Sequence, residues 1–150
     1  MWRGLMVLVF AVAACRSTTQ GGQGGTPEEV FLSLQRLLRV HAYAHVLELL
    51  DPESRAQLSS ALEDPSFARG LGLNPEALRA GSLGEAFAQV LAQDRLRNEA
   101  QYRCLAEGEV GRVEVDGEDC ELRCYHPETE QVRVLILRRV GGRWRIRDLL

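Results

Sequence analysis

Two histidines in the N-terminal half stand at a spacing that binds metal ions when it occurs on a helix. His41 and His45 are four residues apart, which on a helix puts both imidazoles on one face. A metalloprotease-type helical site also needs a glutamate directly after the first histidine, and residue 42 is alanine. His41 also falls on an apolar stripe. The sequence therefore favours a packing face, with Tyr43 against a sheet, over a metal site, and it predicts no cofactor.

Length and charge limit the class of protein. The 150 residues are enough for one domain with its own core. All 18 basic residues are arginines, and with 21 acidic residues the formal charge is −3. A nucleic-acid-binding domain needs strongly basic, clustered cations. Nucleic acid is therefore excluded as an expected partner.

Residues 1–14 have the pattern of a secretory leader. Arg3 precedes an apolar run over residues 5–12, which is shorter than the roughly 20 residues that a membrane-spanning helix needs. Val12-Ala13-Ala14-Cys15 resembles the lipobox of bacterial lipoproteins. That resemblance implies cleavage after residue 14, a diacylglyceryl group on the Cys15 sulfur and an acyl chain, such as palmitate, on its new amino terminus. An ordinary leader with an incidental cysteine is the alternative.

Residues 15–26 continue as a lipidated cysteine and a tether. The stretch is rich in Gly, Ser, Thr and Gln and has no apolar period, which is typical of a flexible linker. Several acyl chains hold a protein on a membrane durably, whereas one chain holds it reversibly. Arg16 stands where an aspartate would resemble the inner-membrane retention signal. We therefore expect a lipid anchor in the cell membrane, on the periplasmic side of the outer membrane in a Gram-negative cell, and one domain over residues 27–150.

Capping residues followed by proline mark helix starts in the first half of that domain. Thr26-Pro27 begins the first helix, with Glu29 placed to close a capping box. Asp51-Pro52 and Asn74-Pro75 repeat the pattern, and Ser82 caps a last helix, while residues 41–50 continue helically after a break. Spacings of three and four predict core-facing stripes. These are Val30, Phe31, Leu34, Leu37, Leu38 and His41 in the first helix and Leu83, Phe87, Val90 and Leu91 in the last.

After Asp94 the apolar period changes to two, which predicts an antiparallel sheet. We expect a hairpin loop at Asp116-Gly117, which sets Val113 opposite Cys120, and another at Gly141-Gly142, which sets Leu137 opposite Ile146. The strands are expected near residues 99–106, 110–115, 119–126, 131–140 and 143–149. The inward-facing residues are then Val113, Val115, Cys120, Leu122, Cys124, Leu135, Leu137, Trp144 and Ile146.

The other face of the sheet mixes charged and apolar residues. Arg138 is expected opposite Arg145, and like charges in that position need carboxylates nearby, which Glu114 and Glu121 could supply. A solvated, charged face is one interpretation. The other is a docking face for a second copy of the chain or for an envelope protein, because an apolar patch usually has a partner. The apolar residues are Val132, Val134 and Ile136.

Lipidation of Cys15 leaves three cysteines, an odd number for an oxidising compartment. Cys120 and Cys124 lie roughly 13 Å apart along one strand and cannot bond to each other. Cys104 is therefore the required partner of any bridge within the chain, with Cys124 favoured. Buried free thiols are the alternative. A zinc site of the thiols with His126 lacks C-x-x-C pairs and is not favoured.

Helices followed by an antiparallel sheet indicate an α+β fold. The segments TPEEVFLSLQRLLRVHAYAHVLELLDPESRAQL, EVDGEDCELRC and LILRRVGGRWRIRDLL resemble the nuclear-transport-factor-2-like superfamily, especially its small bacterial lipoproteins of unknown function. The resemblance implies a cone in which N-terminal helices lie across a curved antiparallel sheet. Residues 64–94 are longer and more helical than that family pattern.

Two functional classes follow from this resemblance. Some cone-fold relatives are isomerases or lyases, and strand alternation puts Asp148 on the inner face, where Tyr43 or Tyr102 could complete a proton-transfer site. Asp148 is two residues from the chain end, which favours a surface aspartate. The sequence therefore favours a membrane-tethered binding or scaffold module over an enzyme.

Overall fold

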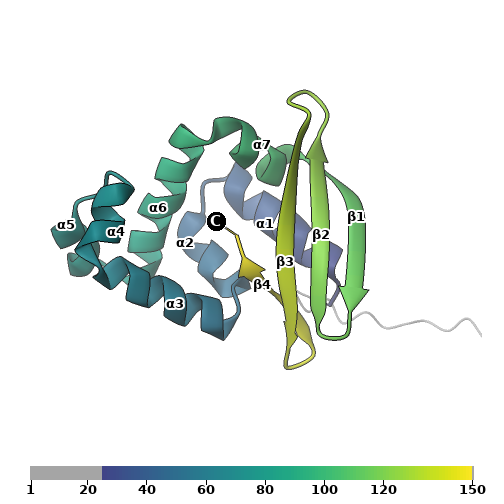
Figure 1. Ribbon diagram of the computed structural model, residues 1–150, viewed down its shortest axis with the longest axis horizontal. Coiled ribbons are helices and arrows are strands. Elements are labelled where there is room, and N and C mark those ends of the chain that lie inside the picture. Colours follow the sequence, from purple (N-terminus) through teal and green to yellow (C-terminus); the bar gives the residue numbers. More distant parts are fainter. Residues whose placement is uncertain (1–24, 150) are drawn as a thin grey trace, which may run out of the picture.

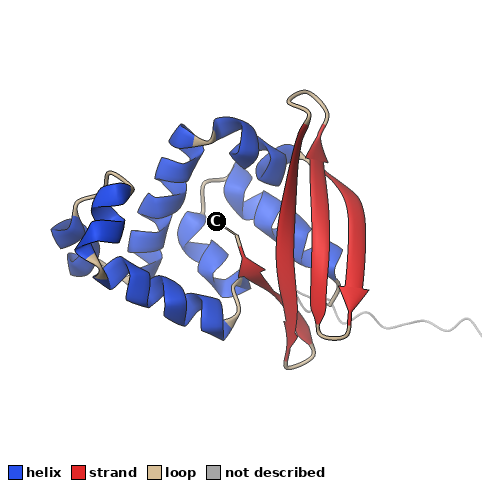
Figure 2. Ribbon diagram, in the orientation of Figure 1, coloured by secondary structure: helices blue, strands red, loops and turns tan. Residues whose placement is uncertain are grey.

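A computed structural model describes residues 25–149 of the chain, and the leader, Cys15 and most of the tether lie outside them. Its described part has an α+β order, with seven α-helices followed by a four-stranded antiparallel sheet. The helices lie on one side of the strands, and α4 and α5 are farthest from the sheet (Figures 1 and 2). The predicted order of helices first and sheet last is confirmed.

Helix α1 (Pro27–Arg39) begins and ends where local chemistry requires. The Thr26 side chain accepts from the Glu29 N–H and the Glu29 side chain accepts from the Thr26 N–H, so the predicted capping box is present. After Arg39 the backbone turns, and His41 adopts a left-handed φ of 57°. His41 is therefore outside the helix and exposed, and its predicted place on the apolar stripe is wrong. The stripe itself buries Val30, Phe31, Leu34 and Leu38.

The next segment ties the helices to the last strand. After α2 (Tyr43–Val46) and a short 3-10 turn (Leu47–Leu49), Leu50 forms a parallel bridge with Ile146. The Asp51 N–H donates to the Ile146 carbonyl at 2.8 Å. The Asp51 side chain then caps α3 (Pro52–Glu63), as its cap-then-proline sequence predicts.

Three further helices form an outlying layer. The expected starts at Asn74 and Ser82 are confirmed in α5 (Pro75–Ala80) and α6 (Leu83–Arg97), and Ser82 closes a second capping box with Glu85. Helix α4 (Pro65–Gly70) lies between α3 and α5. A small apolar cluster joins this layer, and it consists of Leu62, Ala68, Leu78, Ala86 and Val90.

Residues 99–106 form most of a helix, α7 (Glu99–Glu107), so the strand predicted there is wrong. Tyr102, Leu105 and Ala106 are buried and stand three and four residues apart, which is a helical rather than a strand period. The segment is also rich in good helix formers, and Gly108 ends it. Helix α7 packs with α1 on the inner face of the sheet.

The sheet is a meander in the order β1-β2-β3-β4. The β3–β4 register is as predicted, with Leu137 opposite Ile146, and Gly141 and Gly142 take the positive φ values of a tight turn. The first hairpin differs, because its loop is Gly117-Glu118 and Val113 therefore faces Leu122 rather than Cys120. Gly117, at φ 61°, occupies the first loop position, where a type II′ turn needs glycine. The strands are β1 (Glu109–Asp116), β2 (Asp119–His126), β3 (Gln131–Val140) and β4 (Arg143–Asp148).

Side chains from the helices and from the inner sheet face meet in one core. Phe31 of α1 is 1% exposed, Leu137 of β3 is 0% and Trp144 of β4 is 5%. All three belong to the same apolar cluster, together with residues of α6 and α7. The space between the helices and these strands is therefore packed with side chains around Phe31, Leu137 and Trp144.

Candidate functional site

The structure brings Cys104 of α7 and Cys124 of β2 into contact. Their Sγ atoms are 3.3 Å apart as free thiols, and both residues are fully buried. The Cys104 Sγ also lies 3.4 Å from the Cys124 and Gln131 carbonyl oxygens. Because Cys104 lies on a helix over β2 rather than on a strand, no strand separates the two thiols. Burial, with a smaller effect of the hydrogen bond to Cys104, raises the pKa of Cys124 to about 12, so the Cys124 sulfur is a neutral thiol at pH 7.

Cys120 is the third buried thiol of the described residues, and burial raises its pKa to about 11. No contact joins its sulfur to Cys104. The positions of Cys104 and Cys124 thus allow the favoured disulfide to form, and the bond itself stays a prediction.

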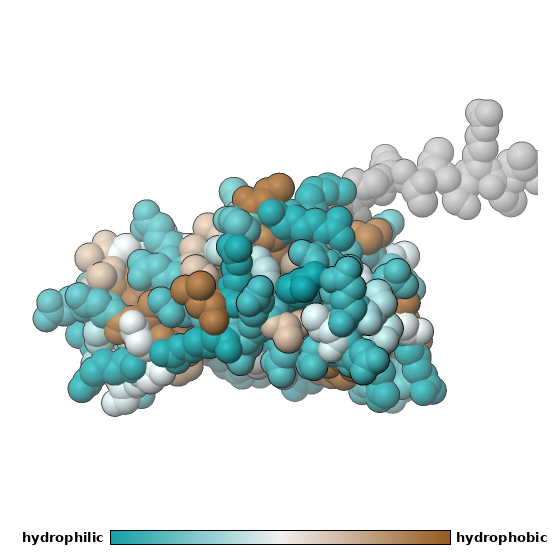
Figure 3. All heavy atoms as spheres, turned by 90° about the horizontal axis from the view of Figure 1, so that it is seen from above, coloured by the Kyte–Doolittle hydropathy of each residue, from teal (hydrophilic) through white to brown (hydrophobic). Residues whose placement is uncertain are grey.

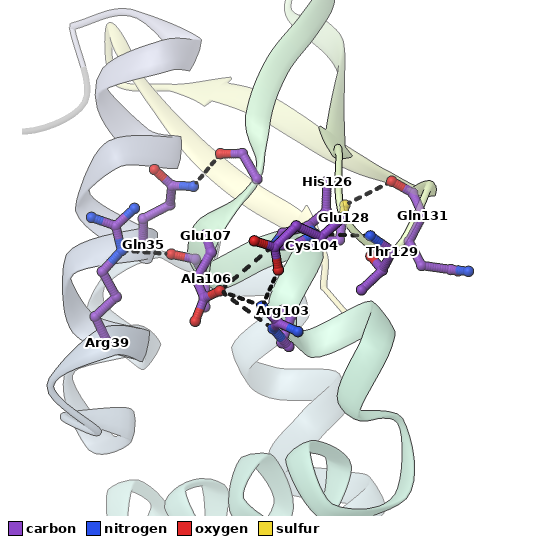
Figure 4. A network of polar contacts seen from close by, with 11 residues as sticks. Gln35, Arg39, Arg103, Cys104, Ala106, Glu107, His126, Glu128, Thr129 and Gln131 are labelled. Atoms are coloured by element: carbon purple, nitrogen blue, oxygen red, sulfur yellow. Dashed lines mark hydrogen bonds and ion pairs between the residues drawn. The ribbon is translucent and has the colours of Figure 1, made fainter.

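A polar network lies beside Cys104 and caps the end of α7 (Figure 4). Gln35 of α1 donates to the Gly108 carbonyl and Arg39 Nε donates to the Ala106 carbonyl, both at 2.7 Å. These bonds satisfy carbonyl groups that a helix end leaves without intrahelical partners. The network therefore fixes α1 against α7.

Glu107 extends this network towards the β2–β3 turn. It pairs with Arg103, which also binds Glu128, and lies 3.5 Å from the Nε2 atom of His126. The Thr129 N–H points at the His126 Nδ1 atom, which must therefore accept, so the ring proton is assigned to Nε2, facing Glu107. His126 thus orders the β2–β3 turn through the Thr129 N–H and Glu107.

The two tyrosines of interest form a buried pair. The Tyr43 and Tyr102 hydroxyls are 3.0 Å apart, and the Tyr102 hydroxyl donates to the Leu38 carbonyl at 2.9 Å. The single hydroxyl proton of Tyr102 is donated to the Leu38 carbonyl, so the Tyr43 hydroxyl must be the donor in the bond between the two tyrosines. Burial, followed by the bond with Tyr43, raises the pKa of Tyr102. Both hydroxyl protons are therefore engaged in joining α2, α7 and α1, and the Tyr43 ring packs edge-on against the Tyr102 ring.

Asp148 does not lie on the inner face, so the inward-facing acid is a wrong prediction. Leu137 pairs with Ile146 but Ile136 pairs with Asp148, so the strand carries one extra residue, Arg147. This bulge reverses the alternation, which turns Asp148 outward and buries Leu149. Asp148 lines an open surface hollow of about 530 Å³. The other lining residues are Glu53, Ser54, Gln57, Ile136 and Arg147, and neither Tyr43 nor Tyr102 is among them.

The two histidines of the possible metal site are not on one helical face. His41 lies past the end of α1, where its Nε2 atom contacts Arg95 at 3.1 Å, and His45 in α2 contacts Glu48 at 3.2 Å. The break between α1 and α2 removes the geometric basis of the i, i+4 argument.

The outer face of the sheet is the most exposed apolar surface on the strands. We use "outer face" for the side chains of β1, β2 and β3 that point away from the helices. Val132 is 58% exposed, Val134 43% and Tyr125 40%, and Tyr125 stands directly opposite Val132. Together with partly exposed Ile136, they form one apolar column along β3 and the end of β2. The charged members of the face are Glu109, Arg112, Glu114, Asp116, Asp119, Glu121, Arg123 and Arg138.

The predicted pairing of Arg138 opposite Arg145 is confirmed, but the carboxylates beside Arg138 are different from those expected. Arg138 binds Glu53 of α3 at 3.1 Å and Asp119 of β2 at 3.2 Å. Glu114 and Glu121 instead pair with arginines of their own strands. Asp119 was missed because its place opposite Arg138 depends on the register between β2 and β3, which the sequence analysis did not predict.

Exposed apolar residues also occur on and beside the helices, with Leu96 at 75%, Val40 at 68% and Leu32 at 56%. Seen from above, the molecule is mostly hydrophilic, with hydrophobic residues in separate patches (Figure 3). Among residues 25–149, no helix has both the length and the apolar character to cross a bilayer. A search of protein-family models, of curated proteins and of solved structures found no match to this chain.

Proposed function

We propose that this protein is a lipid-anchored cell-envelope module that binds a partner through the outer face of its sheet. The anchor rests on the sequence before the described residues, where an apolar leader precedes Val12-Ala13-Ala14-Cys15. The tether of residues 15–26 then joins the lipidated cysteine to α1. The expected site is the cell membrane, with the outer membrane facing the periplasm as the specific location.

The exposed apolar column on the outer face is the observation that carries the binding role. Soluble surfaces carry single apolar residues everywhere, but Tyr125, Val132 and Val134 are contiguous in the strand pairing. The inner side of the sheet is by contrast occupied by α1 and α7. The exception is the edge strand β1, where Val115, which was predicted to face the core, is 56% exposed. Over β2 and β3 a partner can therefore reach the sheet only from its outer side.

The finer fold assignment, a cone of the nuclear-transport-factor-2-like type, is part of this proposal. It is supported by the resembling segments, since DPESRAQL forms the start of α3 and GGRWRI forms the turn into β4. The enzyme alternative has less support, because its only named acid, Asp148, is exposed and its tyrosines are hydrogen-bonded to each other.

Replacing Cys15 by alanine tests the anchor. We expect the wild-type chain to sediment with envelope membranes and to incorporate labelled palmitate, and Cys15→Ala to lose both, because the thioether cannot form. Cys120→Ala is the matched control, since it removes a buried cysteine of the sheet and leaves the anchor site intact. Cys15→Ala protein that still sediments with membranes, or wild-type protein without label, would contradict the proposal.

A further inference from the structure

We infer that the partner of the outer face is a second copy of this chain, bound face to face with the arginines of β1 and β2 over the glutamates of the other copy. This inference rests on the proposed function, in which the outer face is the binding surface. It names the occupant of that surface and the register of the contact.

The charges on β1 and β2 are arranged in two rows of like sign. Arg112 stands directly opposite Arg123, and the next outward-facing pair along the strands is Glu114 opposite Glu121. Directly opposed like charges are unfavourable in a sheet. Within the chain each arginine is compensated along its own strand, by ion pairs between Arg112 and Glu114 and between Arg123 and Glu121. The face therefore carries a row of two arginines beside a row of two glutamates.

A two-fold axis exchanges these rows. If the axis lies in the contact plane, between the rows and at right angles to the strands, each strand lies over its own copy in the reversed direction. Arg123 of one copy then lies over Glu121 of the other, and Arg112 lies over Glu114. Face-to-face sheets pack at an angle of about 30°, which leaves the residues nearest the axis in register. All four rows of the two copies then meet residues of opposite charge.

Part of the apolar column follows the same symmetry. Val134 is the β3 neighbour of Arg123, and Ile136 is the β3 neighbour of Glu121. The axis that exchanges the charged rows therefore places Val134 of one copy over Ile136 of the other. One pair further from the axis, it places Val132 over Arg138 and the edge residue Glu109 over Asp116. Tyr125, one pair further along, would meet Asp119 of the second copy, where a hydroxyl donor faces a carboxylate.

The match of the arginine row to the glutamate row, with Val134 over Ile136 in the same rotation, is what favours a second copy over an unrelated partner. An unrelated protein would need an independent match to both charged rows. Two copies anchored in one membrane are also confined to the same surface, which raises their effective concentration. A dimer of modest affinity is then populated.

The test uses two double variants with opposite charge changes. R112E/R123E makes both rows acidic, and E114R/E121R makes both rows basic. Each variant breaks the same two intrachain ion pairs, so any loss of stability is matched between them. R36E, on the exposed side of α1, is the charge-change control. The full chain is extracted from membranes in mild detergent and its mass is measured by sedimentation with the detergent density-matched.

We expect wild type and R36E to be dimers, each double variant to dimerise at least about tenfold more weakly, and a one-to-one mixture of the double variants to form a heterodimer, because unlike rows then meet again. Monomeric wild type, dimers of either double variant at wild-type affinity, or a mixture that stays monomeric would each overturn the inference. Membrane fractionation of the same proteins is a separate readout. Wild-type protein that is monomeric but still fractionates with membranes would contradict the dimer and would leave the lipid anchor supported.

Discussion

Replacing Cys104 by alanine is expected to lower the free energy of unfolding of the oxidised protein by about 3 kcal/mol, the entropic value for a bridge that closes a loop of about 20 residues. The two sulfurs are 3.3 Å apart in the reduced form and must approach to about 2.05 Å in a bridge. Bond formation releases two protons and transfers two electrons to a thiol–disulfide oxidant of the envelope. Urea denaturation of oxidised and reduced samples measures the effect.

The comparison separates the bridge from packing. Alanine at residue 104 also removes a buried sulfur, and the same substitution in reduced protein gives that packing cost alone. Cys120→Ala is a second control, because Cys120 is equally buried and has no sulfur neighbour within bonding reach. The bridge is contradicted if protein isolated from the envelope without reductant alkylates at Cys104, Cys120 and Cys124 alike.

Phe31→Ala is expected to cost about 3–5 kcal/mol, the usual range for a buried phenylalanine replaced by alanine. Phe31 is 1% exposed in the cluster that joins α1 to the sheet, so the substitution opens a cavity in the shared core. Leu32, the next residue of α1, is 56% exposed, and Leu32→Ala should change stability by no more than about 0.5 kcal/mol. Urea denaturation of both variants checks the difference.

A small effect of Phe31→Ala would have a specific meaning. It would indicate that the space between helices and sheet is a loosely filled pocket, as the enzyme alternative requires, and not a packed core. A cost near that of Leu32→Ala would therefore contradict the closed interior described above.

Helix starts were predictable because their signals are local. A capping side chain and proline satisfy or remove the same few N–H groups wherever they occur, and Thr26, Asp51, Asn74 and Ser82 all cap helices. Asp64-Pro65 carries the same signal and begins α4, which the sequence analysis did not separate from its neighbours. That helix could have been found by applying the rule a further time.

Features that depend on partners or on one extra residue were not predictable in the same way. Residues 99–106 were predicted as a strand because the segments after them alternate, whereas their packing against α1 favours the helix. The bulge at Arg147 turns Asp148 outward, and the alternation of residues in β4 gives no sign of that bulge. The contact between Cys104 and Cys124 follows only once Cys104 is placed on that helix.

The candidate surface was partly predictable. Alternation along β3 separates Val132 and Val134 from the core, and the structure exposes both. The opposed pair of Arg112 with Arg123 was not expected, because the loop of the first hairpin lies one residue later than the sequence suggested. A shift of one loop residue changes every cross-strand pair of that hairpin.

The mass of the amino-terminal peptide of protein extracted from the cell envelope tests the central claim most directly. The proposed function predicts a peptide that begins at Cys15, with a diacylglyceryl group on sulfur and an amide-linked acyl chain on nitrogen. A peptide that begins at Met1, or a Cys15 with no lipid, would contradict it.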